Sequence, residues 1–212
     1  MKRLAAAKIL VVGLGGVGGW CAEALSRTGI GHLVLMDDDV VVWSNLNRQC
    51  PATAATIGRA KAEAMKERIL GINPAVEVVA DCRRYLPDAA AGDLAGFDVV
   101  VDAIDSVDSK AALILNAFEA QVPVVSSMGA AFRFDPCRVR VADFGKVAGD
   151  GLAKALRNRF RKLGRFPGKF DCVWSDEPKA PSFGEGKGSL MQVTAVFGMC
   201  LAAAAVRKVV SA

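Results

Sequence analysis

The sequence contains few of the residues that build metal clusters or acid–base catalytic sets. Its six cysteines are spread along the chain without a C-x-x-C pair, which argues against a zinc site made from paired ligands. His32 is the single histidine, and the sequence shows no Ser/His/Asp or Cys/His arrangement. His32 stands at the start of a predicted strand and is expected to be structural. Any chemistry is therefore expected to depend on other residue types.

Neither a secretion signal nor a low-complexity tract is visible in the 212 residues. The start of the chain runs directly into a predicted strand at Lys8–Val12, so we expect a cytoplasmic protein whose cysteines stay reduced. The composition is 52% hydrophobic and 23% charged, which excludes a disordered chain. No internal repeat or linker divides the sequence. One domain over residues 1–212 is therefore expected.

The last long apolar stretch, Leu190–Val206, is a candidate for a membrane-spanning helix. It includes Gln192 and Thr194 and consists largely of alanine and valine, whereas crossing a bilayer takes about 20 strongly apolar residues. We interpret the stretch as a buried helix. Membrane association through it is the less favoured alternative.

Positive charge is concentrated in one segment. The chain has 27 basic and 22 acidic residues, a net charge of +5. Seven basic residues and no acidic residue fall between Gly151 and Phe170, so the rest of the chain has 20 basic and 22 acidic residues. We expect a basic helical segment at about residues 150–170, with its helix at Leu152–Leu163.

Short apolar runs alternate with helical patterns along the chain. The repeated β-α-β order predicts an α/β fold with a doubly wound, mostly parallel Rossmann-like sheet and helices on both faces. Arg138–Ala142 suits an antiparallel addition in the C-terminal part, and Asp176–Ser189 suits an exposed mobile loop. The predicted strands are Lys8–Val12, His32–Met36, Val76–Ala80, Phe97–Val101 and Val122–Ser126, and the predicted helices between them are Val17–Thr28, Gly58–Leu70 and Ser109–Ala120.

A glycine-rich turn lies between the first strand and the first helix. Gly13–Gly18 reads G-x-G-x-x-G, which lets the backbone and the helix N-terminus approach phosphate groups. Asp37 follows the second strand, where a carboxylate accepts hydrogen bonds from ribose hydroxyls. These features predict nucleotide binding, and they fit a dehydrogenase and an ATP-using enzyme equally well.

Charged residues further along favour ATP. Arg48 ends a polar loop and Lys61 lies on the next helix, so together they can supply cations to a triphosphate. Asp105 follows a strand at the carboxyl edge of the sheet, where it can hold Mg²⁺. Taken singly, Arg48 fits a surface salt bridge, Lys61 a solvated charge and Asp105 a helix N-cap.

Together these segments resemble the E1-like adenylating enzymes. The matching segments are GLGGVG at Gly13–Gly18, the D-x-D of Asp37 and Asp39, SNLNRQ at Ser44–Gln49, Gly58 with Lys61, INP at Ile72–Pro74 and DAIDS at Asp102–Ser106. The resemblance implies that ATP is bound by Gly13, Gly15, Gly16, Gly18, Asp37, Asp39, Asn45, Arg48, Gln49, Lys61 and Asp105. It also implies catalytic roles for Arg48, Lys61 and Asp105, Mg²⁺ on Asp105, and a homodimer.

Within that family the chain is most similar to the branch that acts on a threonylcarbamoyl group of tRNA. The supporting segments are RTGIG at Arg27–Gly31, DAIDSVDSKAALI at Asp102–Ile114, DCVWS at Asp171–Ser175 and VTAVFG at Val193–Gly198. The similarity implies that a carboxylate oxygen attacks the α-phosphorus of ATP and gives an acyl adenylate and pyrophosphate. Internal attack then expels AMP and closes a ring, with net loss of water.

The basic segment fits an RNA substrate. We expect tRNA, not DNA, as the partner, because the segment carries cations without compensating acids and interleaves them with Phe160 and Phe166. A solvated helix face is the plainer alternative, and an acidic sulfur-relay protein would be attracted by the same field. The residues expected to contact tRNA are Lys154, Arg157, Arg159, Arg161 and Lys162.

Two features depart from the family pattern. Only Met1–Ala7 precede the first strand, so Arg3 is the sole arginine available for an arm that would reach the other subunit's ATP. The loop Asp176–Ser189 is shorter than the tRNA-dependent pattern. Adenylation of the C-terminal glycine of a ubiquitin-like or sulfur-carrier protein, and a non-catalytic nucleotide-binding adaptor, therefore stay as alternatives. Cys172 is expected to be a buried small hydrophobe instead of a reactive thiolate.

Overall fold

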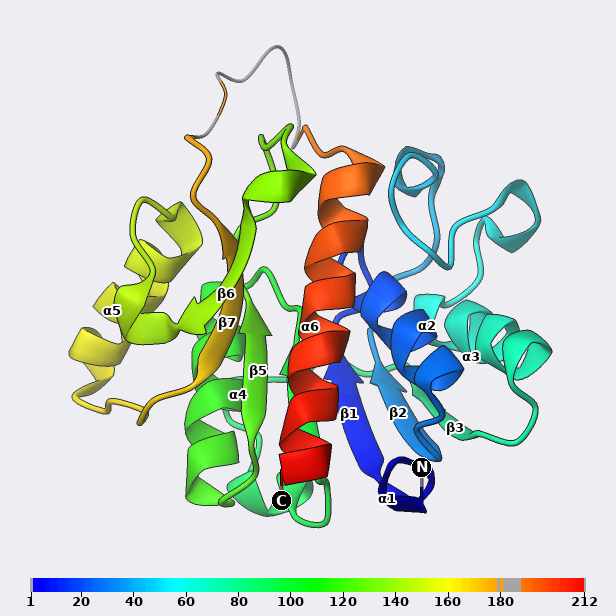
Figure 1. Cartoon of the computed structure of the whole chain (residues 1–212), viewed down its shortest axis with the longest axis horizontal. Helices are drawn as coiled ribbons and strands as arrows, with labels where there is room; N and C mark the ends of the chain where they lie inside the picture. The colour runs from blue at the N-terminus through cyan, green and yellow to red at the C-terminus, as the bar shows by residue number, and fades with distance from the viewer. Residues whose placement is uncertain (1, 179, 181–187, 212) are drawn as a thin grey trace.

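The computed structural model describes residues 2–178, 180 and 188–211. Its centre is a seven-stranded sheet with the strand order β3-β2-β1-β4-β5-β7-β6 (Figure 1). The strands are β1 Lys8–Val12, β2 His32–Met36, β3 Glu77–Asp81, β4 Val99–Asp102, β5 Val124–Ser127, β6 Val139–Asp143 and β7 Asp171–Ser175. The helices are α1 Lys2–Ala6, α2 Gly18–Thr28, α3 Lys61–Ile72, α4 Val107–Glu119, α5 Gly151–Leu163 and α6 Met191–Ser211.

The pairing of the strands confirms the predicted fold class. β1 lies between β2 and β4, and all three are parallel, with Val11 in register with Leu35 and Val101. β6 is antiparallel to β7, with Val141 opposite Val173. From β1 the sheet continues through β2 to β3 on one side, and from β4 through β5 and β7 to β6 on the other. Such a sheet opens a crevice at the carboxyl ends of its strands, where the order reverses.

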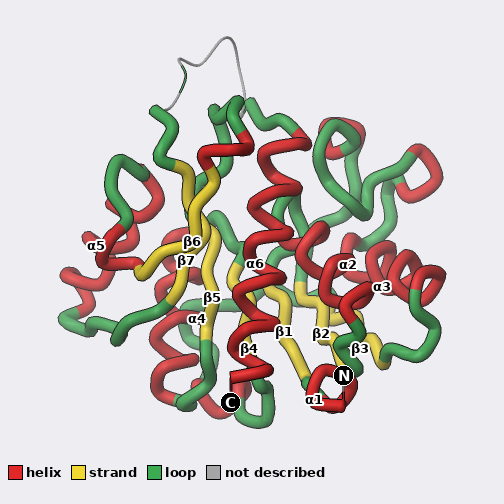
Figure 2. Tube along the Cα trace, viewed as in Figure 1, coloured by secondary structure: helices red, strands yellow, loops and turns green. Residues whose placement is uncertain are grey.

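Helices cover both faces of the sheet, as Figures 1 and 2 show. On one face, alternate strand residues such as Ile9 and Val11 pack with α2, α3 and α6 in one buried cluster. On the other face, Leu10 and Val12 pack with α4 and α5 in a second cluster. Because both faces are covered, the central strands β1 and β4 are almost wholly apolar and buried, and this is why they appear in the sequence as continuous hydrophobic runs.

α6 lies across the face that also carries α2 (Figure 1). Its buried side chains include Val193, Phe197 and Leu201. An ideal Cβ on Gly198 would lie 2.6 Å from the Val17 carbonyl oxygen, so a glycine is required for this close approach to α2. Among the described residues, α6 alone is long and apolar enough to cross a membrane by length and composition, and half of its apolar window is buried inside the protein. Its packing agrees with the predicted buried helix.

Two elements were not predicted. α1 precedes the first strand, and β7 inserts between β5 and β6. β7 mixes polar and apolar residues and pairs with partners that are distant in sequence, so no local pattern identifies it. The predicted mobile loop Asp176–Ser189 lies partly outside the described residues, because 179 and 181–187 are not among them.

Candidate active site

A cavity of about 690 Å³ opens at the carboxyl ends of the parallel strands. It occupies the crevice that the strand order predicts. Ten of the eleven residues expected to bind ATP line it: Gly13, Gly15, Gly16, Asp37, Asp39, Asn45, Arg48, Gln49, Lys61 and Asp105. The amino-acid sequence alone therefore predicts most of one wall of the cavity.

The glycine turn follows β1 directly. Gly13 has φ +89°, and an ideal Cβ there would lie 2.7 Å from the Ala103 carbonyl oxygen, so only glycine fits. Gly18, the eleventh residue, does not line the cavity. An ideal Cβ on Gly18 would lie 1.8 Å from the Gly13 carbonyl oxygen. Its task in this structure is therefore to let the start of α2 pack closely on the turn.

Asp37 faces the cavity from the end of β2. Its carboxylate accepts hydrogen bonds from the backbone N–H of Leu14 at 2.6 Å and of Asp39 at 2.9 Å. Burial raises the pKa of Asp37, and these two bonds together with nearby Lys61 offset the rise only in part. The side chain is thus a fixed hydrogen-bond acceptor at the sheet edge, which suits recognition of ribose hydroxyls.

Lys61 starts α3 and points into the cavity from a buried position. Its Nζ lies 2.7 Å from an Asp39 carboxylate oxygen, and only 6% of its side chain is exposed. The Lys61 backbone N–H also donates to the Asp39 carbonyl oxygen. A buried ammonium needs a compensating anion, and Asp39 supplies one. A triphosphate in the cavity would supply another.

Arg48 and Gln49 come from the loop between β2 and α3. Arg48 Nη1 donates to the Ser44 carbonyl oxygen at 3.0 Å and to Asn47 Oδ1 at 2.9 Å, which aims the guanidinium along the loop. An ideal Cβ on Gly16 would lie 3.2 Å from Arg48 Cγ, so the arginine lies against the glycine turn. Gln49 is buried, and its Oε1 has no hydrogen-bond partner in the part of the chain described. It is an acceptor that a ligand in the cavity can satisfy.

Asp105 lies in the turn Ala103–Ser106, which lines the cavity after β4. Helix α4 begins after Ser106, which is its N-cap without a side-chain cap bond. Asp105 is therefore not the N-cap of α4, which was the alternative interpretation of this residue from the sequence. Asp105 is exposed and lines the same cavity as Asp37 and Asp39.

A buried ion pair next to the turn Ala103–Ser106 holds its backbone in place. Asp102 and Lys110 both have fully buried side chains, with Lys110 Nζ 2.7 Å from Asp102 Oδ2. The same carboxylate accepts the Ser126 hydroxyl at 2.6 Å and the Ile104 backbone N–H at 3.1 Å. Sequence reasoning assigned neither Asp102 nor Lys110 a role. Their contacts fix the backbone that carries Asp105.

Another part of the cavity wall was not predicted from the sequence. Arg83, Arg84 and Tyr85 follow β3, and Arg84 Nε lies 3.0 Å from an Asp38 oxygen. In the sequence, only the position of these three residues after a predicted strand could have identified them as part of the cavity wall. The remaining lining residues are Val12, Val17, Met36, Ser109, Ser127, Met128, Gly129, Ala130, Ala131, Phe132, Leu152, Ser189 and Thr194.

The basic helix is linked to this wall through its N-cap, Asp150. The Asp150 carboxylate accepts the Ala153 N–H of its own helix at 2.8 Å and the Gly129 N–H of the wall at 3.2 Å. The Arg133 guanidinium is 1% exposed, and its nearest carboxylate oxygen is that of Asp150 at 3.9 Å. Asp150 therefore holds α5 against the cavity.

Three of the residues expected to contact tRNA have protein partners, and one of these, Arg161, stays exposed while it donates to Asn158 Oδ1 at 2.9 Å. Arg157 turns inward, donates to the Phe144 carbonyl oxygen at 2.9 Å and lies over the Phe144 ring. Arg159 forms an ion pair with Asp108 of α4 at 2.8 Å. Of the expected contacts, Lys154, Arg161 and Lys162 are exposed. These three form the outward basic face of α5.

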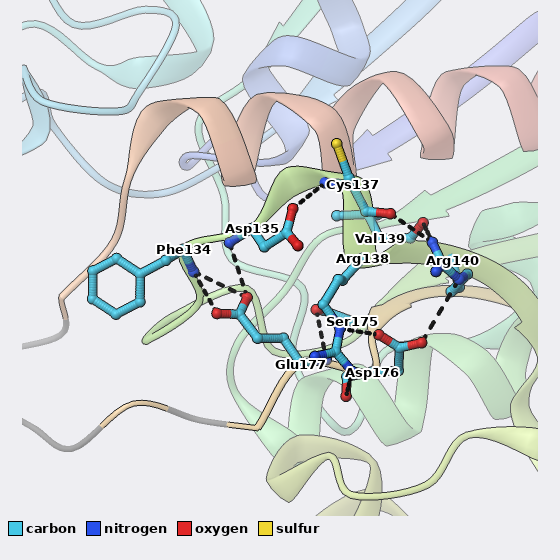
Figure 3. Close-up of polar contacts among 9 residues, drawn as sticks. All are labelled: Phe134, Asp135, Cys137, Arg138, Val139, Arg140, Ser175, Asp176 and Glu177. Carbon is cyan, nitrogen blue, oxygen red and sulfur yellow. Dashed lines mark hydrogen bonds and ion pairs between the residues drawn. The ribbon is translucent and has the colours of Figure 1, made fainter.

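The segment after the wall is anchored beside β6 and β7 (Figure 3). The Glu177 carboxylate accepts the backbone N–H groups of Phe134 and Asp135 at 3.0 Å, and Arg138 pairs with Asp176 at 2.7 Å. The Phe134 ring points away from these contacts in Figure 3. Both anchoring acids follow β7, the strand that the sequence did not reveal.

The remaining expectations concern His32 and Cys172. His32 lies at the start of β2, at the opposite end of the strand from the cavity, and its Nδ1 lies 3.0 Å from a Glu77 oxygen on β3. Cys172 is completely buried, and burial raises the pKa of its thiol. The predicted burial of Cys172 is confirmed, and His32 lies away from the cavity.

The fold and the cavity define a nucleotide-binding protein of the doubly wound α/β class, with cations and carboxylates gathered beside a glycine turn. A more specific assignment comes from comparison with known proteins. The chain belongs to the ThiF family, whose model matches residues 1–212.

Relatives that match most or all of the chain are named tRNA threonylcarbamoyladenosine dehydratases, whereas molybdopterin-synthase adenylyltransferases match 63% of it. The tRNA threonylcarbamoyladenosine dehydratase of Escherichia coli is 38% identical, covering 100% of this chain and 89% of that protein. The Bacillus subtilis protein of the same name is 39% identical over 84% of this chain and 70% of its own length. The crystal structure of the Escherichia coli enzyme with ATP superposes with a TM-score of 0.91 at 41% identity, covering 99% of this chain and 88% of that one.

Proposed function

We propose that this protein is an ATP-dependent tRNA threonylcarbamoyladenosine dehydratase. One observation carries the proposal: the glycine turn, Arg48, Lys61 and Asp105 line a single cavity. Relatives of the same activity match the whole chain, and one of them has been crystallised with ATP. Residues 1–212 then act as one adenylation domain.

The reaction needs charge stabilisation more than proton transfer. A carboxylate oxygen of the threonylcarbamoyl group attacks the α-phosphorus of ATP, the bond to the β-phosphate oxygen breaks, and pyrophosphate leaves. Negative charge grows on the phosphoryl oxygens during this step, and Arg48 and Lys61, which both line the cavity, stabilise it. An internal group of the same side chain then attacks the acyl carbon, AMP leaves, and the ring closes.

Asp105 is the residue we assign to Mg²⁺. Carboxylate oxygens are the donors that Mg²⁺ prefers, and oxygens of Asp37, Asp38 and Asp39 lie within 4.8 Å of one another on the same cavity edge. Asp105 is not one of that group but lines the same cavity, so the residues there offer the oxygen donors that the ion takes. When bound with ATP, Mg²⁺ supplies neutralisation of phosphate charge.

The tRNA is expected to lie along the outward basic face of α5. Lys154, Arg161 and Lys162 are exposed there, and Asp150 links the helix to the cavity wall. Reversing the three charges should weaken tRNA binding and make its salt dependence shallower, because fewer counterions are released. An unchanged salt slope would place the RNA elsewhere.

We also propose a cytoplasmic homodimer. The homodimer rests on the family resemblance, and the cytoplasmic location rests on the dispersed cysteines and the absence of a visible secretion signal. An acidic sulfur-relay protein is proposed as a further partner because the basic segment would attract it. Sedimentation of the purified chain tests the dimer directly, since a monomer at micromolar concentration contradicts it.

The decisive experiment is incubation with ATP, Mg²⁺ and threonylcarbamoyl-modified tRNA. Mass spectrometry of the nucleoside should show loss of one water, accompanied by equal amounts of AMP and pyrophosphate. Unmodified tRNA serves as the substrate control and Arg48→Ala as the enzyme control. If pyrophosphate exchange requires a carrier protein with a C-terminal glycine instead, the alternative adenylation reaction is the correct one.

A further inference from the structure

Phe132 adopts a backbone conformation that its residue type disfavours. Its φ is +60°, in the left-handed region where a Cβ crowds the backbone. Gln121 is the one other non-glycine residue with positive φ in the described part of the chain. Glycine would adopt this conformation without cost. A phenylalanine at this position is therefore expected to have a function that depends on its aromatic ring and offsets the cost of the backbone conformation.

Neighbouring segments hold the Phe132 backbone in place. Its N–H donates to the Gly188 carbonyl oxygen at 2.8 Å, and its carbonyl oxygen accepts the Ala180 N–H at 3.0 Å. The next residue but one, Phe134, is anchored on Glu177 (Figure 3). The conformation is thus imposed by contacts on both sides, which is how functional sites retain costly backbone geometry.

The Phe132 side chain lines the cavity, half-buried. Its ring edge lies against Gly188, where an ideal Cβ would be 3.5 Å from the ring. Thr194 of the same wall lies 3.4 Å from an ideal Cβ on Gly16 in the glycine turn. The wall that carries Phe132 is therefore next to the turn that is proposed to hold the phosphates. Tyr85, the other aromatic lining residue, follows β3 and is hydrogen-bonded to Asn116 behind it.

We propose that Phe132 is a substrate-binding residue that stacks on the adenine base carrying the threonylcarbamoyl group. The inference rests on the proposed function, because the carboxylate must reach ATP and so brings its base into this cavity. Bases extruded from RNA loops are commonly held by stacking on aromatic side chains. The apolar neighbours Ala130, Ala131 and Leu152 suit a flat purine better than they suit phosphate.

Three substitutions separate stacking from packing. Phe132→Leu keeps an apolar side chain but not a flat face, and we expect the KM for modified tRNA to rise about ten-fold with kcat nearly unchanged. Phe132→Tyr keeps the face and should stay within about two-fold of the parent. Phe132→Gly should raise KM like leucine, while its thermal midpoint stays near the parent's because relief of the left-handed conformation offsets lost packing.

ATP binding by calorimetry is the control, and it should be unaffected in all three variants. A merely structural Phe132 would lower the thermal midpoint in the leucine variant and leave the KM for tRNA where it was. An unchanged KM in the leucine and glycine variants, with a parent enzyme that dehydrates tRNA, overturns the stacking role alone. A parent enzyme without activity on modified tRNA overturns the proposed function and this inference together.

Discussion

The buried pair of Asp102 and Lys110 allows a quantitative test of the structure. Both side chains are fully buried, and the ammonium and carboxylate are 2.7 Å apart. Lys110→Met would leave the Asp102 carboxylate charged and uncompensated in the interior. Removing one partner of such a pair costs about 3–5 kcal/mol. That is a large share of an unfolding free energy of about 5–15 kcal/mol.

A second variant identifies the charge as the cause. Asp102→Asn combined with Lys110→Met removes both charges, while the Asn oxygen still accepts the Ile104 N–H and the amide can pair with the Ser126 hydroxyl. Replacing a whole buried ion pair by uncharged groups is often nearly neutral. We therefore expect the double variant to be more stable than Lys110→Met alone by about 2 kcal/mol or more.

Urea unfolding followed by circular dichroism measures these differences. The matched control is the exposed pair of Arg165 and Glu119, whose side chains are more than half accessible at a similar distance of 2.9 Å. Arg165→Met should change the unfolding free energy by less than about 1 kcal/mol. A Lys110→Met protein as stable as this control, or a double variant weaker than the single one, would refute the reasoning.

Three further predictions follow from the described contacts. Burial raises the pKa of Glu23, but hydrogen bonds from its arginine and cysteine partners outweigh it and leave the pKa below its ordinary value. The Glu23 carboxylate therefore stabilises the fold at neutral pH, and this contribution to the free energy of unfolding is lost as the pH falls below about 5. Glu23→Gln should make the free energy of unfolding depend less on pH in this range. An unchanged pH dependence would contradict the lowered pKa of Glu23. Arg48→Ala should slow adenylate formation about 100-fold with little loss of ATP affinity, as pyrophosphate exchange and calorimetry can separate; a pure affinity loss would deny its role in the chemical step. A thiol reagent at pH 8 should modify exposed Cys82 and Cys137 first, whereas burial raises the pKa of Cys50 to about 12 and should protect it until the protein unfolds; rapid native labelling of Cys50 would show that its burial is wrong.

The sequence predicted those parts of the structure that are determined by residues close together in the chain. Apolar runs such as Lys8–Val12 alternate with helical patterns, and a sheet with both faces covered has to look like this in sequence. The glycine turn and the charged residues Arg48, Lys61 and Asp105 were found because their residue types carry the chemistry.

The parts that were missed depend on contacts distant in sequence. The wall that includes Phe132 consists mostly of small or apolar residues, and only the fold brings it opposite the glycine turn. Lys110 appears in sequence as an ordinary helix charge, although the structure buries it against Asp102. Arg157 was counted with the outward cations, but the apolar positions of α5 rotate it toward Phe144.

The position of α6 over α2 and the central strands also has a consequence for synthesis. β1 and α2 leave the ribosome first, yet residues that cover their shared apolar face belong to Met191–Ser211. At ordinary translation rates the growing chain carries that uncovered surface for roughly ten to thirty seconds. That apolar face is therefore open to contacts with other proteins until α6 has been made and has packed on it.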